Sequence, residues 1–438
     1  MRMHNVSNDC GSRVHVSRRS LLQGMGAMSL SSLAVRLGRA EEAAGRSGKE
    51  RPKSVIVLWL KGAPSQYETF DPHPGTKYGG EVKAIDTTVP DLRISEFLPR
   101  TAEQMHRVAL VRSVTGKEGD HQRAIYNMQT GWRPDPTVEH PAIGAIVCHE
   151  LEGGADIPRH ITILPDNTPG RGGYLGAKYD AFKVYDPASR VPDVEAFTDK
   201  ERFERRIDRL TSVVEKNFAR GRLQNLDSVR TLHQVATASA KTMMTSDQLS
   251  AFEVDKESKQ TIAGFGDTPF GRGCLAAVRL IEVGVRCVEV GLSGWDTHAD
   301  NHNGQKTQCD ILDPAYAALL SLLAERDLLD STLVVCGGEF GRTPQINPLA
   351  GRDHWPHGFS IALAGCGLRS GVVHGATSPN PKLEKEDLLS NVADPVTVAD
   401  IHATILKALG VEFDRELITP IGRPLRLSDG KPIESILL

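Results

Sequence analysis

Short, uninterrupted apolar runs recur along this chain, and they constrain its fold more than any other feature. The first is Ser54–Leu60, S-V-I-V-L-W-L, which lies between Lys and Gly residues. A run of this length without polar alternation is typical of a strand buried on both faces of a parallel sheet. Helical patterns separate the runs, so we predict an α/β fold with a mostly parallel central sheet and helices on both faces. The other predicted strands are Val108–Val111, Ile161–Leu164, Val285–Val290, Thr332–Cys336 and Phe359–Ala364.

Three helices of this core are predicted with bounds. Gly271–Ile281 is helical by composition, and Pro314–Arg326 precedes the strand that begins at residue 332. Near the end of the chain, Pro395–Gly410 is predicted to begin after Asp394 and to stop at Gly410, because glycine is favoured just beyond a helix C-terminus.

Residues 199–243 differ from the rest of the chain. Apolar residues there recur at steps of four and three, with charged residues between them, which predicts a pair of amphipathic helices with a charged outer face. We interpret about residues 199–262 as a helical insertion that packs on the α/β core from one side. The first helix carries Phe203, Ile207, Leu210, Val214 and Phe218, and the second carries Val229, Leu232 and Ala236.

The N-terminal segment is predicted to direct export. Arg18-Arg19 precedes a modest apolar run, and small residues follow near Ala40, so residues 1–40 resemble a twin-arginine (Tat) signal. Residues 41–53 are polar and are interpreted as a linker. We therefore expect residues 54–438 to form the mature α/β domain, in the periplasm.

The composition excludes several classes of protein. With 52 Lys and Arg against 55 Asp and Glu, the net charge is −3, without the basic excess of a nucleic-acid-binding protein. No run approaches the roughly 18 apolar residues of a membrane span. The seven cysteines form no C-x-x-C pair, which argues against a zinc ribbon or a disulfide scaffold. We expect small core cysteines and no essential disulfide.

Four polar clusters follow predicted strands, where ligands bind in open α/β sheets. The first is Lys61–Pro72, which includes Ser65, Glu68 and Asp71. The second, G-D-H-Q-R-A, places His121 at the N-terminus of a predicted helix, a position that favours anions. Each of these two segments is equally consistent with an ordinary turn or helix cap.

The third cluster, S-G-W-D-T-H-A-D-N-H, contains Asp296 and His298. Carboxylates and imidazoles at this density suit Zn, Mn or Fe, although a metal-free, hydrogen-bonded loop is the alternative. The fourth cluster, C-G-G-E-F-G-R-T-P and then G-R-D-H-W-P-H-G, contains Glu339 and Arg342, which would also suit a structural ion pair. Its second part contributes Arg352, Asp353 and His354.

These clusters are expected to meet, because the carboxyl ends of parallel strands lie at one edge of a sheet. We predict one cleft in which His121 lies beside a set of metal ligands. In that set His298 is a direct ligand whose other ring nitrogen is held by a carboxylate or a backbone carbonyl. The predicted metal ligands are Asp296, His298, Glu339, Asp353 and His354.

The motifs resemble those of a large bacterial family of unknown function, DUF1501. The strings V-I-V-L-W-L-K-G-A-P-S-Q-Y-E-T-F-D-P, L-I-E-V-G-V-R-C-V-E-V, G-W-D-T-H, G-G-E-F-G-R-T-P and G-R-D-H-W resemble this family in the same order, over about residues 53–435. The family is typically Tat-exported and is grouped with sulfatases and alkaline phosphatases. The resemblance therefore implies an alkaline-phosphatase-like, sulfatase-like fold.

The residues of this chain depart from the sulfatase pattern where the chemistry is carried. The nucleophile of sulfatases lies ten residues before a glycine that resembles Gly131, and His121 stands there. An acidic metal ligand after the first strand is replaced by Lys61-Gly62, and the usual D-H or D-N by Glu339-Phe340. The resemblance thus implies the fold more directly than the reaction.

The sequence supports two classes of function. The first is an exported hydrolase of a sulfate or phosphate ester, either a small molecule or a glycan, with Zn, Mn, Ca or Mg as cofactor. In it, metal-bound water or His121 would attack, and Arg342 or Arg352 would bind the anion as a planar fork. The alternative is a non-catalytic relative that binds an anionic glycan or a protein partner in the same cleft. A structural exported protein is a third, weaker interpretation.

Overall fold

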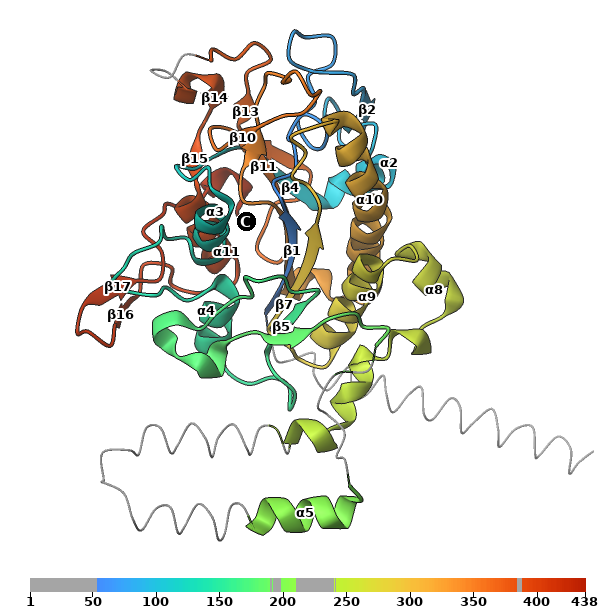
Figure 1. Cartoon of the computed structure of the whole chain (residues 1–438), viewed down its shortest axis with the longest axis vertical. Coiled ribbons are helices and arrows are strands. Elements are labelled where there is room, and N and C mark those ends of the chain that lie inside the picture. Colours follow the sequence, from blue (N-terminus) through green and yellow to red (C-terminus); the bar gives the residue numbers. More distant parts are fainter. Residues whose placement is uncertain (1–52, 190, 192–197, 210–239, 241, 384–387) are drawn as a thin grey trace, which may run out of the picture. The chain divides into compact units, whose positions relative to one another are not determined.

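The core of this computed structural model is a single sheet (Figure 1). The structure describes residues 53–189, 191, 198–209, 240, 242–383 and 388–438. In this part of the chain the sheet has nine strands in the order β12-β4-β11-β8-β1-β7-β5-β6, with β15 beside β4. The strands are β1 (Ser54–Lys61), β4 (Val108–Thr115), β5 (His160–Ile163), β6 (Phe182–Val184), β7 (Cys287–Ser293), β8 (Thr332–Gly337), β11 (Phe359–Gly365), β12 (Val372–His374) and β15 (Val396–Thr397).

The sheet is mostly parallel, as predicted. Only β11 runs against its neighbours, pairing antiparallel with β4 and with β8. All six predicted apolar runs overlap strands of this sheet, although the run from Val285 begins two residues before β7 and the run to Leu164 ends one residue after β5. In β1 the residues Ile56 and Leu58 pack into one hydrophobic cluster, and Val55 and Val57 into the other. This alternation buries both faces of the strand, which explains why its sequence is apolar throughout.

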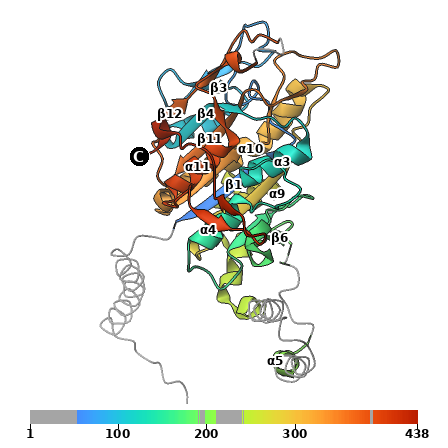
Figure 2. The same ribbon diagram turned by 90° about the vertical axis from the view of Figure 1, so that its left-hand side faces the viewer.

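Helices cover both faces of the sheet, which confirms the predicted layering. One face packs against α2 (Pro99–Gln104), α9 (Pro269–Glu282) and α10 (Asn301–Glu325). The opposite face, which is turned toward the viewer in Figure 2, packs against α3 (His121–Thr130), α4 (Ile143–Glu150) and α11 (Val398–Ala408). Among the described helices, none has the length and apolarity that crossing a bilayer requires.

Several short elements lie outside the main sheet. Four two-stranded pairs are β2 (Ala84–Asp86) with β3 (Arg93–Ser95), β9 (Gly341–Arg342) with β10 (His354–Trp355), β13 (Ala376–Thr377) with β14 (Val392–Ala393), and β16 (Glu416–Ile418) with β17 (Pro424–Arg426). Of these, the β9–β10 pair bears on function, because its register joins Arg342 to His354.

Two helix starts differ from the predictions. The helix expected from Pro314 begins at Asn301, after Asp300 in a left-handed conformation, and runs through the proline. The carbonyl that loses its partner to the missing proline N–H is that of exposed Asp310, where water can replace it. The last helix begins at Val398 rather than at residue 395. Its start is fixed by a capping box in which Thr397 and Asp400 bond reciprocally, and Gly410 follows its end with φ +73°.

The predicted insertion is described only at its ends. Its first part contains α5 (Lys200–Arg209), and residues 210–239 lie outside the described residues. Its far end forms the short turns Asp247–Phe252 and Val254–Lys256, followed by α8 (Lys259–Gly264). Phe252 and Val254 are buried in the main core, so this end packs on the α/β domain. The predicted signal and linker also lie outside the described residues, apart from Lys53.

Candidate metal-binding site

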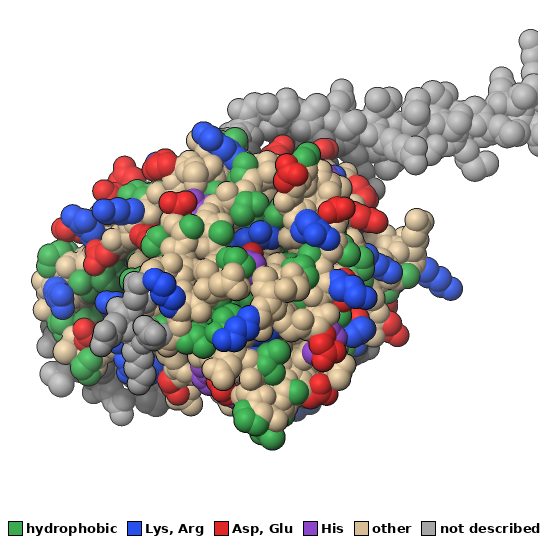
Figure 3. All heavy atoms as spheres, turned by 90° about the horizontal axis from the view of Figure 1, so that it is seen from above, with side chains coloured by type: hydrophobic (Ala, Val, Ile, Leu, Met, Phe, Trp, Pro, Cys, Tyr) green, Lys and Arg blue, Asp and Glu red, His purple; other side chains and the backbone are tan. Residues whose placement is uncertain are grey.

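The sheet topology brings the predicted site residues to one edge. Asp296 follows the carboxyl end of β7, Glu339 follows β8, and His121 begins α3, which is reached from β4. Since β11 runs antiparallel, the segment that enters it, with Asp353 and His354, starts at the same edge. Figure 3 views the molecule from above, at the end where these strands finish, and shows histidine side chains among acidic and basic ones.

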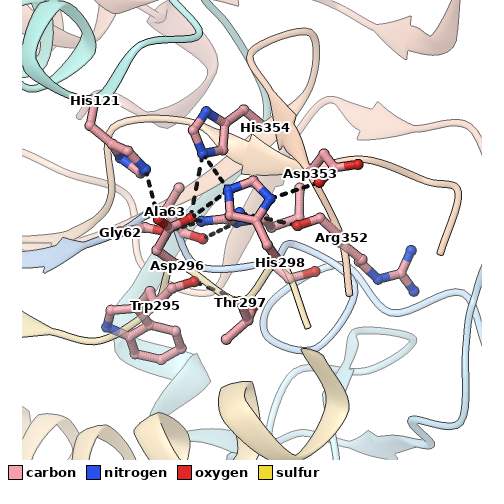
Figure 4. Close-up of polar contacts among 12 residues, drawn as sticks. Gly62, Ala63, His121, Trp295, Asp296, Thr297, His298, Arg352, Asp353 and His354 are labelled. Atoms are coloured by element: carbon pink, nitrogen blue, oxygen red, sulfur yellow. Dashed lines mark hydrogen bonds and ion pairs between the residues drawn. The ribbon is translucent and has the colours of Figure 1, made fainter. Parts of the chain in front are cut away.

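Asp296 is the centre of the cluster (Figure 4). Its Oδ1 lies 2.6 Å from Nη2 of Arg342, 3.1 Å from Nε2 of His298 and 3.4 Å from Nε2 of His354. Its Oδ2 lies 3.3 Å from Nε2 of His121. Burial raises the pKa of Asp296, but the hydrogen bond and charge of Arg342 outweigh burial and lower it overall. The side chain is therefore a carboxylate near neutral pH.

The two imidazoles beside Asp296 are both held through Nδ1. The Nδ1–H of His298 donates to Oδ1 of Asp353 at 2.7 Å, and the Nδ1–H of His354 donates to the carbonyl of Gly119 at 2.7 Å. Burial lowers the pKa of His354, and the hydrogen bond from His298 lowers the pKa of Asp353. His354 is thus neutral, with its lone pair on Nε2, and the carboxylate of Asp353 fixes the same tautomer in His298.

These two Nε2 atoms face each other at 3.0 Å. Two lone pairs at that distance repel unless a proton or a cation lies between them. Bonds of about 2.0–2.2 Å from one metal ion place neighbouring ligand atoms about 3 to 3.6 Å apart. The separations among Nε2 of His298, Nε2 of His354 and Oδ1 of Asp296 are 3.0, 3.1 and 3.4 Å, so these three atoms fit one divalent ion. A three-residue group containing His121, Asp296 and His354 is also compact enough to hold an ion.

His121 lies against the cluster and is oriented by Glu339. Its Nδ1–H donates to Oε1 of Glu339 at 2.7 Å, and this buried carboxylate also accepts the N–H of Gly62 at 3.0 Å. Nε2 of His121 is buried, without a hydrogen-bond partner in the described part of the chain. The hydrogen bond to Glu339 raises the pKa of His121 although burial opposes it. Asp120 caps the helix that His121 begins, since its side chain accepts the N–H of Arg123.

Arg342 is fully buried and contacts the cluster through Asp296. Besides Asp296, its guanidinium donates to the carbonyls of Gly62, Ala63 and Arg352. It therefore orients the side chain of Asp296 and stabilises its ionised form. Its remaining hydrogen bonds go to backbone, so the geometry argues against the anion-binding role that the sequence suggested for it.

Arg352 is likewise fully buried and is further from the reactive groups. It donates to Oε1 of Glu68 at 3.1 Å and to the carbonyls of Thr343, Pro344 and Tyr78. A planar fork for a bound anion needs free N–H groups, and here they bond within the chain. Arg352 fixes the loop between β9 and β10 rather than a ligand.

The structure separates the other candidates from the site. The side chains of Glu68 and Asp71 bond to Arg352 and Thr377, so the first cluster contributes only backbone groups, those of Gly62 and Ala63. Gly62 has φ +103°, and a Cβ there would lie 2.6 Å from the backbone N of Asp296, so the two loops approach closely only because it is glycine. The roles of the Gly62 N–H and the Gly119 carbonyl were missed, because backbone contacts leave no signal in a sequence motif.

A comparison with protein-family models assigns the chain to a family. The model of the family described as Protein of unknown function (DUF1501) matches residues 52–437. The chain belongs to this family. No curated protein matches the chain. This DUF1501 protein is similar in structure to proteins of the alkaline phosphatase and sulfatase group, but at about one identical residue in ten, so the roles of its residues follow from its own geometry.

Three solved structures illustrate the similarity. A protein in the alkaline phosphatase superfamily from Vibrio parahaemolyticus has 11% identity and a TM-score of 0.34, covering 83% of this chain and 67% of its own. The PsFucS1 sulfatase from Pseudoalteromonas sp. has 11% identity and a TM-score of 0.40, covering 86% and 71%. The periplasmic domain of EcEptC from Escherichia coli, in complex with Zn, has 9% identity and a TM-score of 0.39, covering 89% and 92%.

Proposed function

We propose that this DUF1501 protein is a metal-dependent hydrolase of a sulfate or phosphate ester, carried by a small molecule or a glycan. The observation that carries the proposal is the pair of imidazole Nε2 atoms 3.0 Å apart, with a carboxylate oxygen within 3.4 Å of both. Two nitrogens and one oxygen form the donor set that suits Zn or Mn better than Ca or Mg. A bound divalent ion would supply Lewis-acid polarisation of an ester oxygen.

His121 is the proposed general base. Its Nδ1–H is held by Glu339, so in the neutral imidazole Nε2 carries the lone pair, 3.3 Å from Oδ2 of Asp296, and a divalent ion bound to Asp296 would offset the repulsion between these two atoms. From this position Nε2 takes the proton from an attacking water, and the buried Glu339 carboxylate stabilises the imidazolium that forms. The N-terminus of α3, where Asp120 caps the N–H of Arg123, carries a partial positive charge that favours an anionic group beside His121.

The experiment is metal analysis of purified protein combined with a screen of aryl phosphates, a phosphodiester and aryl sulfates. Wild type is expected to hold a metal ion that His298→Ala loses, and to hydrolyse at least one ester. His121→Ala is expected to keep the metal and lose the hydrolysis. His374→Ala is the matched control, because this histidine lies on β12 and bonds only to Ser435 and Asp394.

Two results would overturn the proposal. Equal metal content in wild type and His298→Ala would remove the metal site. Metal that depends on His298, together with no hydrolysis of any phosphate or sulfate ester, would instead favour a non-catalytic protein that binds an anionic ligand.

Export through the Tat pathway to the periplasm is proposed on the basis of Arg18-Arg19. Replacing both with Lys keeps the charge but removes the guanidinium groups. Precursor is then expected to accumulate in the cytoplasm, and normal export of that variant would contradict the assignment.

A further inference from the structure

A second cluster of metal-ligand side chains lies at the beginning of two neighbouring strands, away from the carboxyl ends that carry the candidate active site. It consists of His160 on β5 with Cys287 and Glu289 on β7, and we name it the closed cluster. One ligand atom from each residue lies within 4.8 Å of the others, and all three residues are buried. The site proposed above uses none of them.

Strand register brings the three side chains together. His160 pairs with Cys287 across the parallel β5–β7 ladder, and Glu289 lies two residues after Cys287. Residues two apart on a strand point to the same face. In this case the face is the one that α4 covers, where Gly144 of α4 contacts His160 and Cys287. The backbone therefore fixes all three positions, without any loop.

The imidazole of His160 is oriented as it is in many metal sites. Its Nδ1 lies 2.9 Å from the carbonyl of Tyr179, to which the Nδ1–H donates. Its Nε2 points to the interior of the cluster, 3.2 Å from Oε1 of Glu289. A backbone carbonyl that holds the other ring nitrogen is the usual support for a metal-binding histidine.

Two glycines from separate segments let backbone pack directly against these atoms. A Cβ on Gly144 would lie 2.3 Å from Nε2 of His160 and 2.6 Å from Sγ of Cys287. A Cβ on Gly170 would lie 2.6 Å from Oε1 of Glu289 and 3.0 Å from Nε2 of His160. Glycine is a poor helix former, yet Gly144 is the second residue of α4. Both glycines thus bring backbone against the three ligand atoms, and any larger residue at either position would collide with them.

We propose that His160, Cys287 and Glu289 form a closed structural site for a transition-metal dication of the Zn²⁺ type. The thiolate and the carboxylate would balance the two positive charges in a region without water. A thiolate with an imidazole selects such an ion over Mg²⁺ or Ca²⁺. Since the ligands are buried, the ion is taken up on folding and stabilises the interface between β5, β7 and α4.

Cobalt substitution tests this site separately from the candidate active site. The full-length protein is produced in medium with Co²⁺ as the added transition metal, and its near-ultraviolet and visible absorption is recorded. Cobalt bound to a thiolate gives a sulfur-to-cobalt charge-transfer band, which a site of histidine and aspartate alone cannot give. Wild type and His298→Ala are both expected to show the band, and Cys287→Ala is expected to lose it.

The matched control is Cys274→Ala, which removes another fully buried thiol from α9 and is expected to keep the band. Folding of each variant is checked by circular dichroism. Absence of the band from folded wild type overturns the proposal, whatever the variants do, and leaves His160 and Glu289 as an ion pair beside a neutral thiol. A band that persists in Cys287→Ala also overturns it.

Discussion

The protein contains two clusters of histidines and carboxylates, and they differ in their position on the sheet. In the cluster at the strand ends, the side chains of His298 and Asp296 are 46% and 44% exposed. In the closed cluster, those of His160 and Glu289 are 2% and 1% exposed. The residue types overlap, so composition does not separate the two clusters. Loops beyond the strands give access to solvent and substrate, whereas positions within the strands are rigid and give no access.

The histidines of the two clusters give the largest expected contrast. His298→Ala is expected to reduce ester hydrolysis by at least about 10²-fold, the cost of losing one electrostatic contact to a reacting group, with little change in stability. His160→Ala leaves the buried carboxylate of Glu289 unpaired, which costs about 3–5 kcal/mol of stability. Kinetic assays and denaturant unfolding of both variants measure this. The comparison fails if His160→Ala folds as stably as wild type.

A third histidine shows the effect of burial on a histidine pKa when no carboxylate lies beside the ring. His402 on α11 is buried with only the Met128 carbonyl as partner, and burial lowers its pKa to about 4. In the unfolded chain a histidine binds its proton below about pH 6.5. Between those values the unfolded state binds more protons, so stability falls as pH decreases from about 6.5 to about 4, by roughly 3 kcal/mol. His160 behaves differently: burial lowers its pKa, but the hydrogen bond and the charge of Glu289, with the Tyr179 carbonyl, together outweigh burial and raise it.

The variant His402→Gln keeps a donor for the Met128 carbonyl and removes the titration. Its unfolding free energy is expected to lose less than that of wild type between pH 7 and pH 4, as measured by urea unfolding at each pH. Parallel pH profiles of the two proteins would show that His402 carries no such effect.

Replacing one glycine beside each cluster with alanine compares how tightly the two clusters are packed. Gly144→Ala places a Cβ 2.3 Å from Nε2 of His160, and overpacking of a core costs about 1–3 kcal/mol. Gly119→Ala is the matched control at the strand-end cluster, because nothing lies within 4 Å of its added Cβ. Thermal unfolding is expected to show a lower midpoint for Gly144→Ala only. Equal effects of the two substitutions would mean that the clusters are packed alike.

Much of the fold could be predicted because its determinants are local. Six of the nine strands of the sheet overlap predicted apolar runs, whereas the short strands β6, β12 and β15 were not predicted. The grouping of Asp296, Glu339 and His354 follows from one rule about strand ends. The start of α10 could not be predicted, since it depends on the left-handed Asp300 and on the tolerance of Pro314 inside the helix.

The parts of the site that were not predicted depend on distant backbone. Whether Arg342 is free for an anion depends on the carbonyl of Gly62, 280 residues earlier in the chain. The closed cluster escaped notice because His160 and Glu289 are 129 residues apart and meet only through strand register. The pairing of β5 with β7 cannot be deduced from the spacing of residues within either motif.

The smallest expected effect concerns the support of His298. Asp353 accepts the Nδ1–H of His298 at 2.7 Å and is 55% exposed, so in Asp353→Asn the amide oxygen or water can take over the contact. Loss of a partner that orients a metal ligand costs about 10- to 100-fold in metal affinity, and this exposure favours the lower end, about tenfold. Competition of wild type and variant against a chelator measures the ratio. Asp353 fixes the tautomer of His298 that turns its Nε2 lone pair toward the proposed ion beside Asp296. An unchanged metal affinity would therefore mean that the loops alone position the ligands of the exposed cluster, as the strands position those of the closed cluster.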